Sequence, residues 1–143
     1  MRIMLDTNIT IDILTNRQPF CTDSIACYKK ALLHGDKIYI STVSVADVMY
    51  ITKHYFSDKS KQLQIVLNFI NTLKIAKVTE KDLRFGFSGV MPDFEDALQY
   101  YSAMTEQADM IITRNGKDFK HATIPIYTPV QFLELMEDEI NRI

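Results

Sequence analysis

Hydrophobic residues along the chain follow two patterns, short unbroken runs and longer stretches with helical spacing. Short apolar runs bounded by polar or turn residues are typical of buried strands, whereas apolar residues at every third or fourth position are typical of amphipathic helices. The first pattern predicts five strands, at "RIML", "KIYIS", "KIAKV", "DMIIT" and "IPIYT". The second predicts helices between these strands and one more helix after the last of them.

The predicted helices vary in how clearly their apolar face is marked. They cover Ile9 to Leu14, Thr22 to His34, "TVSVADVMYITKHYF", "SDKSKQLQIVLNFINTLK", "TEKDLRFGF", "PDFEDALQYYSAMTEQ" and "VQFLELMEDEI". The clearest is the fourth, whose spacing predicts one buried stripe of Leu63, Val66, Leu67, Ile70 and Leu73. In the sixth, the stripe of Phe94, Leu98 and Tyr101 fits a core or a dimer face better than a platform for stacking bases.

The alternation of strands with helices predicts the fold class. It indicates an α/β protein with a mostly parallel central sheet covered by helices on both faces. With 143 residues the chain fits a single domain spanning residues 1–143. In sheets of this kind ligands bind beyond the carboxyl ends of the strands, so we expect the functional residues at that edge.

Composition adds limits on function and location. The formal net charge is −2, which excludes a strongly basic coat for nucleic acid, so a polyanion must be met by a local patch or through metal ions. The apolar start of the chain is interrupted at Asp6 and is too short for a signal peptide. No run reaches the roughly 18 apolar residues that cross a bilayer, so we expect a cytoplasmic protein with no membrane partner.

The two cysteines, Cys21 and Cys27, fall in one predicted helix. Their six-residue separation corresponds to about 9 Å along a helix axis. That exceeds the roughly 7 Å that a disulfide allows between Cα atoms. We expect two reduced, buried thiols.

Polar oxygen ligands occur at several points of the predicted sheet edge. Asp6 ends the first strand, Asp47 lies early in the helix after "KIYIS", and Asp96 lies in the first turn of the "PDFEDALQYY" helix. Thr113 and Asn115 follow the fourth strand. Carboxylates that converge raise one another's pKa unless a cation neutralises them, and a bound divalent ion reverses that balance.

Some of these acids have simple structural explanations. Asp6 suits the N-cap of the helix that follows it. Asp93 and Asp96 have the spacing of an N-cap residue and its N3 partner, and capping is the better interpretation for Asp93. Asp96 is followed at once by Ala97 and Leu98, which places it next to the core.

The remaining polar residues divide in the same way. Asp47 stands among apolar residues, where an unpaired charge is costly. Asn115 and Asp118 fit turn positions around "GKDF" as well as they fit a ligand site. The coincidence of all these residues at one edge favours a shared chemical role.

Four segments together carry a resemblance to a known family. "LDTNITIDILTNRQPF", "ISTVSVADVMYI", "PDFEDALQYYSAMTEQADMIITRNGKDF" and "IPIYTPVQFLELM" closely resemble the PIN domain, in the branch of VapC-like toxins. The resemblance covers nearly the whole chain, and "DFEDALQYYSA" followed by "TRNGKDF" is its most specific part. It implies a three-layer α/β/α PIN-like fold and a ribonuclease that hydrolyses RNA phosphodiester bonds with Mg²⁺ or Mn²⁺.

The resemblance also implies a set of site residues. The catalytic, metal-binding acids are Asp6, Asp47 and Asp96, where Asp47 replaces the Glu that the family usually has. At the fourth acid position the chain has Asn115 where Asp is common, with Asp118 as a substitute. The supporting polar residues are Thr7, Asn8, Ser44 and Thr113, together with the expected cap Asp93. Mg²⁺ prefers one or two carboxylates plus water and phosphate oxygens, so we expect Asp6 and Asp96 to bind one ion, with Asp47 binding directly or through water.

Local positive charge is needed for RNA, and Arg114 and Lys117 follow the fourth strand close to the expected site. The resemblance implies RNA as substrate, with an antitoxin protein and a second copy of the chain as partners. Two other functions stay open. One is a PIN-like module that binds RNA or protein without cutting; the other is a phosphatase with Asp6 as nucleophile, which lacks the second Asp and the lysine motif such enzymes need.

Overall fold

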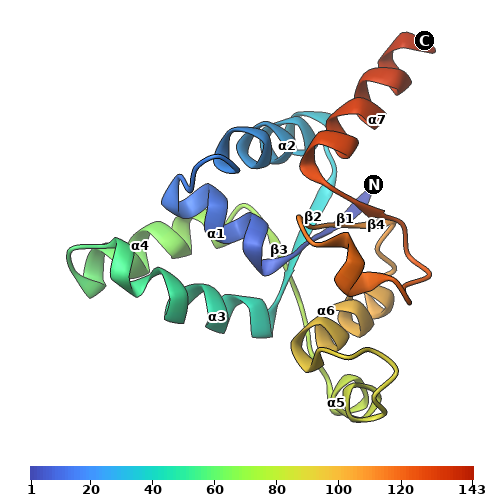
Figure 1. Cartoon of the computed structure of the whole chain (residues 1–143). Coiled ribbons are helices and arrows are strands. Elements are labelled where there is room, and N and C mark those ends of the chain that lie inside the picture. Colours follow the sequence, from blue (N-terminus) through green and yellow to red (C-terminus); the bar gives the residue numbers. More distant parts are fainter.

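The computed structural model describes residues 1–143 and contains the predicted alternation of strands and helices (Figure 1). All five predicted strands are present, and helices connect or follow them. The strands are β1 Arg2–Leu5, β2 Lys37–Ser41, β3 Lys74–Ala76, β4 Met110–Ile112 and β5 Ile126–Tyr127. The α-helices are α1 Thr7–Thr15, α2 Cys21–His34, α3 Thr42–Thr52, α4 Lys59–Ile70, α5 Glu80–Phe87, α6 Phe94–Thr105 and α7 Pro129–Asn141, and short 3₁₀ helices cover η1 Lys53–Tyr55 and η2 Gly116–Phe119.

The sheet is parallel throughout and has the strand order β3-β2-β1-β4-β5. Strand β1 lies in the middle, where it pairs with β2 on one side and with β4 on the other. The chain builds outward from β1 to β3 and then returns to β4 on the opposite side. The point where this order reverses lies between β1 and β4, and open parallel sheets form a ligand crevice at the carboxyl ends of such strands.

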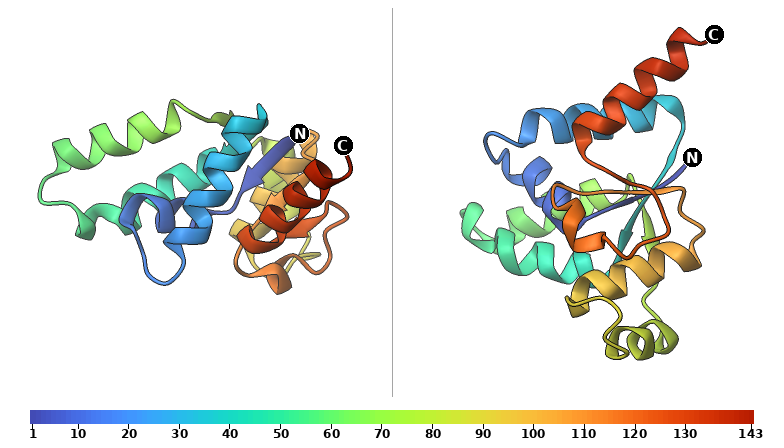
Figure 2. Two further views of the ribbon diagram at one scale, coloured as in Figure 1. Left: turned by 90° about the horizontal axis from the view of Figure 1, so that it is seen from above. Right: turned by 45° about the vertical axis from the view of Figure 1, so that its right-hand side comes forward.

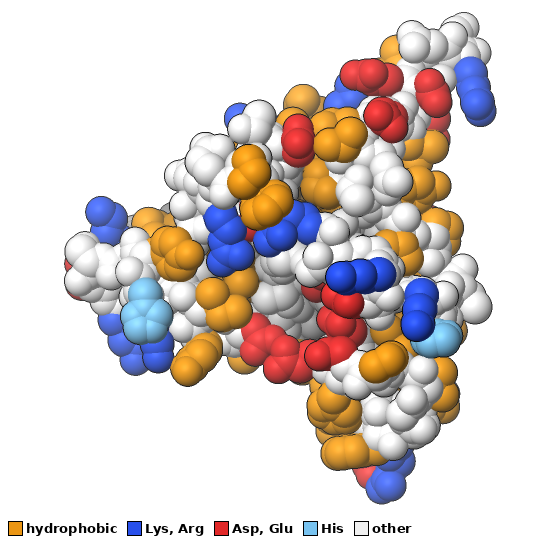
Figure 3. Space-filling view, in the orientation of Figure 1, with side chains coloured by type: hydrophobic (Ala, Val, Ile, Leu, Met, Phe, Trp, Pro, Cys, Tyr) orange, Lys and Arg blue, Asp and Glu red, His pale blue; other side chains and the backbone are white.

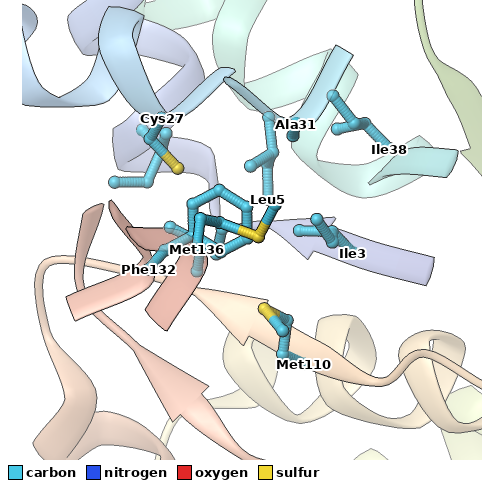
Figure 4. Packing of buried hydrophobic residues seen from close by; sticks show 10 residues of the cluster. Ile3, Leu5, Cys27, Ala31, Ile38, Met110, Phe132 and Met136 are labelled. Carbon is cyan, nitrogen blue, oxygen red and sulfur yellow. The ribbon is translucent and has the colours of Figure 1, made fainter. Parts of the chain in front are cut away.

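Helices cover both faces of the sheet, which confirms the three-layer α/β/α arrangement (Figures 1 and 2). One face packs against α2 and α7, and Figure 4 shows this cluster, in which Phe132 and Met136 of α7 lie against Ile3 and Leu5 of β1. The other face packs against α6 and contains Met4, Tyr39, Ala97, Tyr100 and Ile111. A third, smaller cluster joins α1, α3 and α4 to β2 through Ile11, Ile40, Val48 and Val66.

Helix α5 packs on the outer side of α6, against Phe94 and Tyr101. The ring of Phe94 lies 4.8 Å from that of Phe87, and the ring of Tyr101 lies 4.9 Å from that of Phe85, centre to centre. Leu98 is buried in the same helix. The predicted stripe of Phe94, Leu98 and Tyr101 is therefore packing surface within the chain.

The buried face of α4 differs from the one that its sequence predicts. Val66 is buried as expected, but Leu63 and Leu67 are 48% and 57% exposed, and Gln62 and Phe69 are buried in their place. The Gln62 side chain donates to the carbonyl of Met49 and to the hydroxyl of Thr52, both in α3. These hydrogen bonds satisfy the buried amide of Gln62 against α3, and with Gln62 on this face Leu63 and Leu67 point toward solvent.

Cys21 and Cys27 both lie in α2, buried and unbonded, in agreement with the sequence prediction. Burial raises the pKa of the Cys27 thiol to about 12, which keeps it protonated and unreactive.

None of the helices combines the length and the apolar character that crossing a membrane requires.

The core between the sheet and α7 gives a direct test of the packing. Phe132 is fully buried there, so Phe132→Ala is expected to lower the free energy of unfolding by about 3–5 kcal/mol, through lost burial and the cavity left behind. Leu33→Ala is the matched control, because Leu33 is 88% exposed and its loss is expected to change stability by less than about 0.5 kcal/mol. Urea unfolding followed by circular dichroism measures both, and equal losses would contradict the assignment of α7 to the core.

Candidate active site

A pocket of about 550 Å³ opens at the carboxyl ends of β1 and β4. Its walls come from α1, α3, α6 and the segment that follows β4. Figure 3 shows this face of the molecule, with acidic side chains gathered along one rim of a central hollow and basic side chains along the opposite rim. Nine residues predicted for the site line the pocket: Asp6, Thr7, Asn8, Ser44, Asp47, Asp96, Arg114, Asn115 and Asp118.

Asp6 lies at the base of the pocket, where β1 ends, and only 7% of it is exposed. One carboxylate oxygen accepts from the backbone N–H of Thr7 and from the Gln99 amide, each at 2.7 Å. The other accepts from the Thr113 hydroxyl at 2.6 Å and from the Asn8 amide at 3.1 Å. Asp6 is thus the N-cap of α1, as the sequence allowed, and is also held by groups from α6 and from the end of β4.

A chain of hydrogen bonds fixes the groups that hold Asp6. The Thr7 hydroxyl donates to Ser44 Oγ at 2.7 Å, and the Ser44 hydroxyl donates to the side-chain oxygen Oε1 of Gln99 at 3.1 Å. The amide nitrogen of Gln99 is then directed at Asp6. The predicted supporting residues Thr7 and Ser44 therefore act on Asp6 through Gln99, which the sequence analysis did not include.

Asp93 and Asp96 have different roles: Asp93 caps α6, and Asp96 lines the pocket. Asp93 caps α6 by accepting from the backbone N–H of Asp96 at 2.9 Å, and it is exposed outside the pocket. Asp96 faces the pocket. Its pKa is raised from 3.8 to about 7 by burial, and then by the negative charges of Asp6, Asp93, Asp118 and Glu95.

Asp47 is half-buried on α3 and pairs with an acid from α6. A side-chain hydrogen bond to Asp47 raises the pKa of Glu95, with smaller contributions from burial and from the charges of Asp47 and Asp93. Carboxyl groups this close favour the protonated form of Glu95, which is why its pKa rises. Glu95 thus brings a longer acid beside the shorter Asp47.

The segment after β4 places the fourth acid position on the pocket rim. Thr113 is fully buried and its hydroxyl accepts from the backbone N–H of Asn115 at 3.0 Å while donating to Asp6. Asn115 and Asp118 are exposed and both line the pocket. The charge of Asp118 contributes to the raised pKa of Asp96, which places it nearer to the acids than a simple turn role requires.

The two residues predicted to bind RNA have different surroundings. Arg114 lines the pocket, but its guanidinium forms a two-pronged contact with the fully buried Asp12, at 2.6 and 3.3 Å, and lies 3.9 Å from the ring centre of Phe20. Its primary contact is therefore structural, and the sequence missed Asp12 as its partner. Lys117 lines a neighbouring hollow that also contains Asp96 and Asp118.

The residues of the pocket fit a divalent cation, although they do not form a complete site. No three His, Cys, Asp or Glu side chains of the chain are close enough together to hold a metal ion. Five acids line the pocket: Asp6, Asp47, Glu95, Asp96 and Asp118. None of them forms a salt bridge. The buried Oδ1 of Asn8 has no hydrogen-bond partner. Such a surplus of negative charge and free oxygen suits Mg²⁺ or Mn²⁺, which take one or two carboxylates and complete their shell with water.

The sequence analysis missed four polar residues of the pocket: Glu95, Gln99, Arg17 and Tyr50. Helical spacing held a signal for three of them, because Gln99 follows Asp96 by three residues, Glu95 precedes Gln99 by four, and Tyr50 follows Asp47 by three. Arg17 stands in an irregular segment, so its position depends on the path of the chain after α1.

The chain was compared with known protein families and with curated proteins. A family model described as a PIN domain matches residues 2–117. The matched segment includes every acidic residue of the pocket except Asp118. The comparison with curated proteins found no match.

Several solved structures share the fold. A chain of VapBC2 from Rickettsia felis, bound to a DNA fragment from its promoter, has a TM-score of 0.63 at 24% identity and covers 89% of this chain and 97% of that one. A toxin–antitoxin complex from Klebsiella pneumoniae gives 0.62 at 24%, with coverage of 89% and 97%. VapBC-1 from nontypeable Haemophilus influenzae gives 0.69 at 19%, with coverage of 91% and 99%.

The raised pKa of Asp96 predicts a pH-dependent stability of the metal-free protein. Between pH 3.8 and about 7 the folded chain binds more protons than the unfolded chain, so stability falls as the pH rises through this range. In EDTA, Asp96→Asn is therefore expected to unfold at a higher temperature than the natural chain at about pH 8. The gain corresponds to ~4 °C for each kcal/mol of repulsion removed, and it should be smaller at about pH 5. Thermal unfolding at both pH values tests this, and a gain of equal size at both would contradict it.

Proposed function

The chain belongs to the PIN-domain family, and we propose that it is a metal-dependent ribonuclease that hydrolyses RNA phosphodiester bonds. One observation carries the proposal: five acids line a single pocket, and none of them is neutralised by a basic side chain. A folded protein does not gain stability from such an arrangement, since the charges of neighbouring acids raise the pKa of Glu95 and of Asp96. A divalent cation relieves that repulsion and supplies what phosphodiester hydrolysis needs.

In this proposal Asp6 and Asp96 hold Mg²⁺ or Mn²⁺. Asp6 is the fixed ligand, because four hydrogen bonds set its orientation before any ion arrives. Asp96 has to lose its proton, and an arriving cation favours that loss by lowering its pKa. Asp47 and Glu95 lie beside these two as a pair that binds directly or through water, and Asn115 or Asp118 completes the rim.

When bound, the ion would polarise the scissile phosphate and lower the pKa of the attacking water. The residues of the chain contribute in other ways. Asp6 and Asp96 orient the ion, and Thr7, Ser44 and Gln99 keep Asp6 in place. Arg114 and Lys117 contribute positive charge at the edges of the acidic region, with Arg114 braced against Asp12.

The structural neighbours support a proposal about partners. The solved structures with this fold include toxin–antitoxin complexes, one of them bound to promoter DNA. We propose that this chain is likewise the toxin of such a pair, with an antitoxin protein as its inhibitor and a second copy of itself as a further partner. A cytoplasmic location stays a prediction.

A second function, a PIN-like module that binds RNA or protein without cutting it, is favoured by one observation. No three potential ligands are close enough to form a metal site, and Asp47 and Asn115 replace the family's usual residues. The phosphatase alternative is disfavoured, since position 8, two residues after Asp6, is Asn rather than the second Asp that such enzymes need, and the lysine motif is missing as well.

Metal binding is the first test of the proposal. Mg²⁺ or Mn²⁺ is expected to raise the unfolding temperature above its value in EDTA. At a metal concentration of 100 times the dissociation constant, the free energy of unfolding should increase by about 2.7 kcal/mol. Asp96→Asn is expected to remove most of this rise. Asp138→Asn is the matched control, because Asp138 is exposed on α7 far along the chain from the pocket residues, and it should keep the full rise. Absence of a rise in the natural chain would favour the non-catalytic module.

RNA cleavage is the second test. Asp6→Asn and Asp96→Asn are each expected to lower the rate by more than about 100-fold, as removal of a main electrostatic group does. The measurement is single-turnover cleavage of a labelled RNA, with circular dichroism to verify that each variant is folded. Asp138→Asn again serves as control, and cleavage at the natural rate by either pocket variant would refute the assignment.

A further inference from the structure

Tyr50 is a large aromatic residue that the proposed chemistry does not use. It lies on α3 three residues after Asp47 and lines the acidic pocket, yet it is 70% exposed. The rings of Phe94 and Tyr101, by contrast, pack against α5. Tyr50 has no aromatic neighbour, and its one charged contact is the Lys53 ammonium, 4.2 Å from the ring centre.

The exposed ring leaves apolar area in water at the mouth of a charged pocket. Burying such a ring stabilises a complex, and a tyrosine loses little side-chain entropy on binding because it has few rotatable bonds. Asp47 lies one helical turn before Tyr50 on α3, and a divalent cation bound among the pocket acids would offset its charge. Lys53 adds a positive charge beside the ring. A flat, uncharged group attached to a phosphate chain matches this surface.

Arg17 provides a phosphate-binding group in the same pocket. Arg17 and Arg114 both contact the buried Asp12, but Arg114 does so at 2.6 Å and Arg17 only at 3.7 Å. One carboxylate thus faces two guanidinium groups, which leaves one net positive charge on the pocket wall. The Arg17 side chain is 32% exposed, so it reaches the pocket with donors to spare.

We propose that Tyr50 and Arg17 form a subsite for one unpaired nucleotide of single-stranded RNA, next to the phosphate that is cleaved. The base stacks on Tyr50, and the neighbouring phosphate pairs with Arg17. Proteins that read single-stranded RNA stack unpaired bases on exposed aromatic rings, whereas a duplex keeps its bases stacked internally. The pocket volume of about 550 Å³ lies within the range of ligand-sized sites.

The subsite names the residues that would contact the unpaired nucleotide, and it rests on the proposed ribonuclease function. It also assigns the exposed tyrosine to RNA rather than to a protein interface, since the ring lies among the residues of the acidic pocket.

A fluorescence experiment reports on the base contact without requiring cleavage. The chain has no tryptophan, so Tyr50→Trp and Tyr55→Trp each introduce a single reporter. Tyr55 is the matched control, because it is 54% exposed but does not line the pocket. Both are made in the Asp96→Asn background with Mg²⁺ present and are titrated with a short single-stranded RNA and with the same sequence as a duplex.

Quenching of Tyr50→Trp by single-stranded RNA, with a weaker response to the duplex and none in Tyr55→Trp, would support the subsite. Equal responses of the two reporters, or no response while labelled RNA binds by anisotropy, would overturn it. A response to protein concentration alone, without one to RNA, would also overturn it and mark a protein interface. Cleavage by the natural chain is measured separately, so loss of the subsite and loss of the nuclease function are distinguishable.

Affinity measurements complete the test. Tyr50→Ala is expected to bind single-stranded RNA about 5-fold to about 150-fold more weakly, while Tyr50→Phe stays within about 2-fold because it keeps the ring. Arg17→Gln is expected to reduce the slope of log affinity against log salt by about 0.7, the value for one phosphate contact on a single strand. Tyr55→Ala should match the natural chain, and an equal loss in Tyr55→Ala and Tyr50→Ala would refute the proposal.

Discussion

The carboxylate of Asp6 accepts hydrogen bonds from three separate parts of the chain: the start of α1, the Gln99 side chain of α6 and the Thr113 hydroxyl after β4. A buried charge of this kind is costly unless each of its oxygens is satisfied. The requirement therefore fixes how α1, α6 and the end of β4 meet, and it sets the position of Asp96 three residues before Gln99. The rest of the pocket is arranged around this one group.

Two buried or half-buried acids near the pocket show opposite uses of negative charge. Asp12 is fully buried and paired with Arg17 and Arg114, so it stabilises the position of the basic wall. Asp96 faces like charges and no basic partner, and its pKa is raised accordingly. The first arrangement needs nothing further, whereas the second leaves a negative charge unpaired unless Asp96 takes up a proton or a cation binds. This separation gives the pocket one acidic and one basic side, visible in Figure 3.

The separation also suits the geometry of a nucleic acid. A phosphate chain held at the acidic side would have Tyr50 and Arg17 in the same pocket, with Arg17 on the basic side. With an overall charge of −2, the protein as a whole repels RNA, so RNA binding needs a local patch of positive charge.

Much of the fold was predictable because apolar periodicity reports burial directly. The five strands, the alternation with helices and the parallel sheet followed from it, and so did the capping role of Asp93. Prediction was wrong for α4, where Leu63 and Leu67 are exposed and Gln62 is buried. Periodicity counts apolar residues on a face but does not detect the carbonyl and hydroxyl of α3 that make Gln62 the better buried group.

By itself the sequence determined which acids stand at the ends of strands and in the first turns of helices, because these positions depend on local pattern alone. Asp6, Asp47 and Asp96 were identified in that way. Only the tertiary structure decided that Glu95 hydrogen bonds to Asp47, that Gln99 reaches Asp6 and that Arg114 binds Asp12. These contacts join residues from 48 to 102 positions apart, by the numbering of the chain, and no local pattern encodes which side chains meet once the helices pack on the sheet.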